Sequence, residues 1–191
     1  MRDIFLDGLR ILDLLEITGS TATTASWVNC DQSSVSRSYR RVSDQLGLSF
    51  GKTAGRYQAR SHLPLLSCLR QAAQMLRLDR GARMLQWVSH VELPLTRPLL
   101  SHCGPIPRCW NEPSRTLDLL RQRVLDLAVM PDPTQQRVAA LGELCILPLA
   151  PSHPAQVVIL RELQDQPALQ QLITQLETTA AASRIVAAAN P

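Results

Sequence analysis

Residues 32–50 have the sequence QSSVSRSYRRVSDQLGLSF, and this stretch decides the fold of the N-terminal part of the chain. Val35, Tyr39, Val42 and Leu46 recur at spacings of four, three and four, which places them on one face of a helix. The residues that turn away from this face are short or basic: Gln32, Ser33, Ser36, Arg37, Arg40 and Arg41. The pattern predicts an amphipathic helix with a polar, basic face turned to solvent.

Two shorter helices and a hairpin are expected on either side of this helix. Apolar residues recur at helical spacing from residue 4 to 15, and Gly19 ends that helix. Ser20 or Thr21 suits the N-cap of a second helix to about residue 29, as Asp31 suits that of the third, which Gly47 ends. Residues 52–60 contain a glycine among alternating polar residues, which favours a small hairpin.

Residues 61–80 predict a fourth, longer helix. Leu66, Leu69, Ala73 and Leu76 keep a 3-4-3 spacing, which is typical of a helix that packs along a seam. We therefore expect these four residues to form a dimerisation seam against a second copy, with Gly81 as a hinge after the helix.

Beyond residue 81, short apolar runs alternate with helical segments. Strands are expected at 84–88, 106–110, 124–130, 145–149 and 157–160, and helices at 94–100, 115–123 and 167–178. This alternation predicts an α/β domain with a largely parallel sheet. The expected organisation is a domain of helices and a hairpin over 1–60, a linker helix over 61–80, an α/β domain over 81–180 and a flexible tail over 181–191.

We expect a globular protein, soluble and cytoplasmic. Of its 191 residues 45% are hydrophobic and 19% charged, and the sequence has neither a run long enough to span a membrane nor a secretory signal. The formal net charge is +4, and the basic residues concentrate in the first two thirds. A phosphate backbone is one partner that such a distribution suits.

Within residues 19–50 the order and spacing of motifs resemble the LysR-type transcriptional regulators. The matching segments are Gly19–Ser20, Ala25, residues 32–37 and residues 46–50, and weaker similarity continues over residues 120–129 and 144–154. The resemblance implies an N-terminal winged helix-turn-helix, a long linker helix and a small C-terminal α/β domain that is similar to one subdomain of a periplasmic-binding-protein-like effector domain.

The resemblance also implies a DNA-binding face. Gln32, Ser33, Ser36 and Arg37 match positions at which the family touches DNA. Arg37 has the geometry for a bidentate bond to guanine and Gln32 for one to adenine. Three more basic residues, Arg40, Arg41 and Lys52, are expected at phosphates, and Arg56 at the hairpin tip is expected at the minor groove or phosphates.

The effector-binding half is shorter than the resemblance leads one to expect. After His153–Pro154 the chain passes almost directly to residues 157–161, so the second subdomain of the family is missing. A cleft with one wall cannot bury most of a ligand. No small-molecule effector is therefore expected.

No pattern of catalytic or cofactor-binding residues stands out. His90, His102, Cys103 and Cys109 lack the spacing of a zinc site, so neither metal nor cofactor is expected. Cys103 and Cys109 are interpreted as buried thiols, with a redox pair as the alternative. An enzyme is not expected.

The sequence thus predicts a homodimeric, sequence-specific regulator that binds double-stranded DNA and has a truncated effector domain. The alternative is a protein-interaction module that heterodimerises with a full-length regulator and whose DNA binding is weak or decayed. Binding to duplex DNA that depends on salt and on sequence separates the two.

Overall fold

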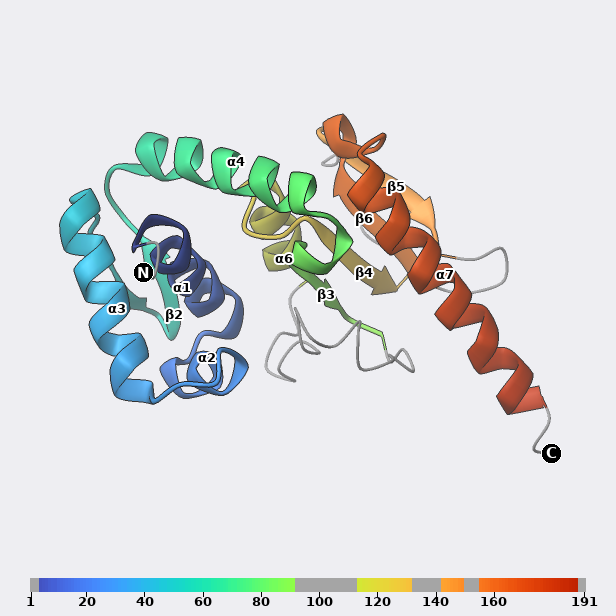
Figure 1. The fold of residues 1–191 in the computed structure, drawn as a ribbon, viewed down its shortest axis with the longest axis horizontal. Coiled ribbons are helices and arrows are strands. Elements are labelled where there is room, and N and C mark those ends of the chain that lie inside the picture. The colour runs from blue at the N-terminus through green and yellow to red at the C-terminus, as the bar shows by residue number, and fades with distance from the viewer. Residues whose placement is uncertain (1–3, 92–112, 132–141, 150–154, 189–191) are drawn as a thin grey trace. The chain divides into compact units, whose positions relative to one another are not determined.

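The computed structural model describes residues 4–91, 113–131, 142–149 and 155–188. The chain divides into two compact units, residues 1–73 and 74–191, and each is described by itself. Helices and strands both contribute to the fold, as Figure 1 shows. The expected helix at 94–100 and strand at 106–110 lie outside the described residues.

The N-terminal unit consists of three helices followed by a two-stranded hairpin and the first turns of a fourth helix. The helices are α1 (Ile4–Thr18), α2 (Thr21–Trp27) and α3 (Gln32–Leu46), and the strands are β1 (Phe50–Thr53) and β2 (Arg56–Ala59). The predicted caps are confirmed at two of these helices. Ser20 accepts a bond from the backbone N–H of Thr23, and Gly47 ends α3 in the left-handed region at φ 63°.

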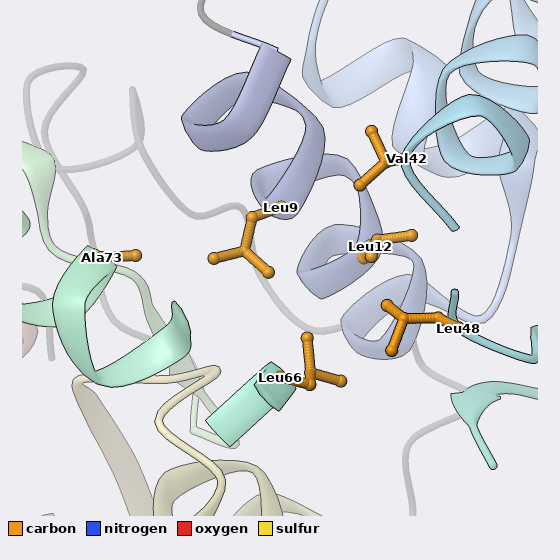
Figure 2. Packing of buried hydrophobic residues seen from close by; sticks show 6 residues of the cluster. All are labelled: Leu9, Leu12, Val42, Leu48, Leu66 and Ala73. Carbon is orange, nitrogen blue, oxygen red and sulfur yellow. The ribbon is translucent and has the colours of Figure 1, made fainter. Parts of the chain in front are cut away.

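The core of this unit is apolar and draws on α1, α3 and the start of α4 (Leu63–Arg80). Figure 2 shows its buried members, which are Leu9, Leu12, Val42, Leu48, Leu66 and Ala73. A second buried group, Leu15, Ala25 and Val35, joins the three helices. The apolar face predicted for residues 32–46 therefore packs inward, and the opposite face of α3 is left to solvent.

The predicted dimerisation seam is corrected by this packing. Leu66 is 2% and Ala73 8% exposed, and Leu69 packs against the same cluster, so these three belong to the core of the chain itself. Leu76 alone of the four is exposed, at 39%. The 3-4-3 spacing identified the buried face of α4 correctly but not its partner, because an apolar seam packs equally well against α1 of the same chain.

A buried ionic cluster fastens the first half of α4 to α1. The Arg70 Nε donates to Asp13 at 2.8 Å, and the Arg70 Nη2 donates to Glu16 at 3.0 Å. Burial alone lowers the pKa of Arg70, but the two carboxylates outweigh it and raise the pKa above its ordinary value. The two ion pairs therefore link Arg70 of α4 to two acidic residues of α1.

The C-terminal unit contains a mixed four-stranded sheet with the order β3-β4-β6-β5. Its strands are β3 (Trp87–Ser89), β4 (Leu127–Pro131), β5 (Leu144–Pro148) and β6 (Ala155–Leu160). Among the strands that the structure describes, only β3 and β4 pair in parallel, whereas β6 runs antiparallel to both β4 and β5. The expectation of a largely parallel sheet is therefore wrong. Residues 149–154 are too few for the crossover that a parallel β5–β6 pair needs.

Helices flank this sheet, and several boundaries differ from expectation. The 3₁₀ helix η1 (Ala82–Met84) occupies the start of the strand predicted at 84–88. The helix α6 (Pro113–Arg121) packs on β4 and β6, and η4 (Arg161–Leu163) leads into α7 (Pro167–Ala188). The last helix continues to Ala188, beyond the end expected at residue 178. Strands β4 and β6 are buried almost throughout, as expected for strands covered on both faces.

Asp126 ties the second half of α4 to the sheet. Its carboxylate accepts from Arg77 Nε at 2.8 Å, from Gln74 Nε2 at 3.0 Å and from the backbone N–H of Gln86 at 2.7 Å. The Arg77 Nη2 adds a bond of 2.9 Å. Because Asp126 is fully buried, these donors supply the solvation that its charge requires.

Candidate nucleic-acid interface

The polar face of α3 is a basic surface backed by the apolar core. Five of the six residues predicted on it are exposed and Ser36 is half-buried; the exposed ones are Gln32, Ser33, Arg37, Arg40 and Arg41. Val35 and Val42, on the opposite face, are buried at 0% and 4% exposure. The structure thus brings these six residues together on one side of one helix.

The hairpin places two more of the predicted residues. Lys52 and Arg56 are exposed, on β1 and at the start of β2. Thr53 pairs with Arg56 around the turn formed by Ala54 and Gly55, both of which have positive φ. This two-residue turn fixes the register, so Lys52 stands opposite Tyr57.

An aromatic cluster joins the hairpin to α3. The ring centroids of Tyr39, Phe50 and Tyr57 lie 5.7–6.0 Å from one another. The Arg40 guanidinium lies 5.8 Å from the Tyr39 centroid, and the Lys52 ammonium lies 6.0 Å from that of Tyr57. These contacts are within the range of cation–π attraction, so two of the expected phosphate-binding residues are partly held in place.

The surroundings of Tyr57 in this cluster shift the pKa of its hydroxyl upward. Burial raises the pKa of Tyr57, and the neighbouring Tyr39 raises it further, against a smaller lowering by Arg40. The sequence analysis did not identify Tyr57. The turn signal at Ala54–Gly55 would have revealed it, because that turn sets Tyr57 across from Lys52.

Two polar contacts order side chains on the exposed face. Gln32 Nε2 donates to the Thr21 hydroxyl at 2.8 Å, and Arg37 Nη2 donates to the Ser34 hydroxyl at 3.4 Å. Thr21 was also missed by the sequence analysis. Its contact joins residues on different helices, and no local pattern marks it.

The other candidate sites are a metal site and the cysteine thiols. Among residues 4–91, 113–131, 142–149 and 155–188, no group of three or more His, Cys, Asp or Glu is arranged to hold a metal ion. His102, Cys103 and Cys109 lie outside these residues. Cys30 and Cys145 are half-buried free thiols, and Cys68 is an exposed one. Within the same described part of the chain, no helix has the length and apolar character needed to cross a membrane.

Comparison with known proteins gave matches only among solved structures. No family model and no curated protein matches the chain. OxyR C199D from Pseudomonas aeruginosa shares 18% identity over 75% of this chain and 54% of its own, with a TM-score of 0.42. ArgP from Mycobacterium tuberculosis shares 18% over 78% and 53%, with a TM-score of 0.35. The Vibrio cholerae virulence activator AphB, a member of the LTTR protein family, shares 16% over 74% and 52%, with a TM-score of 0.32.

The chain spans about half the length of these solved structures. All three TM-scores lie below 0.5. The solved structures similar to this chain include LysR-type transcriptional regulators, the family that the motif in residues 32–50 resembles.

Proposed function

We propose that the chain is a sequence-specific DNA-binding transcriptional regulator of LysR type. In this proposal α1, α2 and α3 with the β1–β2 hairpin form a winged helix-turn-helix, and α3 enters the major groove. The observation that carries it is the exposed basic face of α3, which stands on a helix whose other face is buried in the core. No catalytic role is assigned.

The residues divide into those proposed to select sequence and those proposed to bind the backbone. Gln32 and Arg37 have the donor and acceptor groups to recognise adenine and guanine, and Ser33 and Ser36 are small enough to let the helix approach. Arg40, Arg41, Lys52 and Arg56 are proposed to contact phosphates and the edge of the minor groove. The cation–π contacts of Arg40 and Lys52 support this division, because they limit the movement of those two charges.

Binding to duplex DNA over a series of salt concentrations tests this function. A duplex selected by the chain from a randomised library is compared with a duplex of scrambled sequence. We expect log K to fall linearly with log salt on both duplexes, with tighter binding to the selected one. Equal, weak binding to both would favour the protein-interaction module instead.

We further propose that the regulator is a homodimer joined along the exposed side of α4. This side carries Leu65, Cys68, Ala72 and Met75 at 3-4-3 spacing, and the fraction exposed is 42% for Leu65 and 64% for Met75. A second copy of the same helix would cover both large apolar side chains. The proposed dimer therefore uses the face next to the one that the sequence analysis selected, because each of its residues precedes one of that set by a single position.

The exposed thiol of Cys68 provides a direct test of this dimer. In a variant with its other cysteines replaced by serine, mild oxidation is expected to yield a Cys68-linked dimer. Met75→Glu is expected to give monomers by sedimentation, because a charge would enter the seam. Asp79→Glu on the same helix, exposed and already charged, is the matched control. An unchanged dimer in Met75→Glu would refute this interface.

For the C-terminal unit we propose a reduced regulatory domain that does not bind an effector between two subdomains. The supporting observation is that β6 pairs with both β4 and β5, while only residues 149–154 separate β5 from β6. This connection between β5 and β6 is too short to contain a second subdomain. A thermal-shift screen of metabolites is expected to give no ligand that alters DNA affinity, and such a ligand would overturn the proposal.

A further inference from the structure

Thr21 is the first residue of α2, and it contacts the first residue of α3. The side-chain amide Nε2 of Gln32 donates a hydrogen bond of 2.8 Å to the Thr21 hydroxyl oxygen. We propose that Thr21 is a positioning residue that orients Gln32 for one base pair, and so sets specificity there without touching a base. This inference rests on the DNA-binding function proposed above.

Gln32 needs such a partner because its side chain is exposed. An exposed glutamine populates many rotamers, and binding a base would restrict it to one at an entropic cost. The hydrogen bond to Thr21 reduces the number of Gln32 rotamers before the protein binds DNA. The ordered side chain then discriminates better between base pairs, because a fixed amide cannot adapt to the wrong pattern of donors and acceptors.

The contact leaves the recognition groups of Gln32 available. A glutamine amide has two N–H groups and one oxygen with two lone pairs. Thr21 accepts from one N–H, so the second N–H and the oxygen remain for a base. That remaining pair is the one that bonds adenine at N7 and N6 in the major groove. The expected target is therefore an A·T pair.

Thr21 itself stands on a rigid backbone. The Thr18 and Thr24 hydroxyls bond to each other at 2.7 Å inside the unit, and Thr18 also donates to the carbonyl of Ser20 at 3.0 Å. Ser20 caps α2 with its side chain. These bonds tie the end of α1 to the start of α2, so the Thr21 hydroxyl has a defined position from which to hold Gln32.

The experiment combines Thr21→Val, which replaces the hydroxyl with a methyl, with Gln32→Ala. Affinities are measured for the duplex selected from the randomised library, for its single base-pair variants and for a scrambled duplex. Thr21→Val is expected to weaken binding to the selected duplex by about three- to tenfold and to leave scrambled DNA unchanged. The loss should fall on discrimination at one A·T pair.

The double variant separates positioning from a general structural effect. In a chain that already carries Gln32→Ala, Thr21→Val should cause no further loss, because the residue that it positions is gone. Thr21→Ser keeps the hydroxyl and is expected to bind like the unmodified chain. Thermal unfolding of each variant verifies folding, and Thr21→Ala provides a second removal of the hydroxyl.

Two results would overturn the inference while leaving the proposed function intact. One is unchanged discrimination in both Thr21→Val and Thr21→Ala. The other is an equal loss on selected and scrambled duplexes, which would make Thr21 a phosphate contact. Failure of the unmodified chain to prefer any duplex sequence would instead refute the proposed function, and this inference with it.

Discussion

Asp126→Ala should strongly destabilise the C-terminal unit. The change removes the acceptor of four hydrogen bonds, two from Arg77 and one each from Gln74 and the backbone of Gln86. The Arg77 side chain is only 11% exposed, so its charge would be left buried without its carboxylate. Breaking a buried pair in this way costs about 3–5 kcal/mol. Since whole domains are stable by about 5–15 kcal/mol, this is a large share of the total.

Asp118→Ala is the matched control for this prediction. Asp118 pairs with Arg121 at 3.3 Å within one helix, and its side chain is 54% exposed. A surface pair of this kind contributes about 0.2–0.5 kcal/mol, so the two substitutions should differ by about tenfold in free energy.

Urea unfolding monitored by Trp87 measures the difference. Trp87 is 3% exposed and follows Gln86 directly, so its emission reports on the unit that contains Asp126. Replacing Trp27 and Trp110 with phenylalanine in both variants removes the other indole signals. The midpoint for Asp126→Ala is expected about 2 M lower than the control. A midpoint equal to that of Asp118→Ala would refute the argument from the buried network.

Three further outcomes are expected. Arg37→Ala should weaken binding to the selected duplex by about 1–3 kcal/mol with little effect on scrambled DNA, whereas Arg41→Ala should weaken both and reduce the salt slope by about one. Ala54→Asn should raise the free energy of unfolding of the N-terminal unit by about 0.5–1 kcal/mol, because Ala54 has φ 49° and asparagine tolerates that region better. An unchanged melting temperature would contradict this. Burial lowers the pKa of His90 below 6.5, so the unfolded chain binds more protons and the stability present above about pH 6.5 should decrease as pH falls. His90→Gln should flatten that pH dependence of the melting temperature, and an equal slope in both proteins would contradict it.

The helices of the N-terminal unit could be predicted from the sequence because their signals are local. Apolar spacing over residues 32–46 identified the buried face of α3, and Ser20 and Gly47 marked helix ends. The six residues on the opposite face followed from the same periodicity. Their role in DNA binding stays a prediction, since it depends on a partner and not on the fold of the chain.

The sheet of the C-terminal unit was predicted less well. Apolar runs located β4, β5 and β6 to within a few residues, yet β6 proved antiparallel to both neighbours. A buried run has the same composition in either direction, so composition does not determine strand direction. The short segment between β5 and β6 was the available signal, because a parallel pair requires a longer connection.

The sequence by itself determined where the helices and most strands lie and which face of α3 is basic, because periodicity and capping act between residues a few positions apart. Only the tertiary structure decided which residues each helix or strand contacts. Leu66 and Ala73 pack into the chain's own core, and Asp126 accepts hydrogen bonds from Arg77 of α4. Thr21 of α2 accepts a hydrogen bond from Gln32 of α3. Such contacts join residues of different helices or strands, and their formation depends on the packing of the whole unit and not on any local pattern.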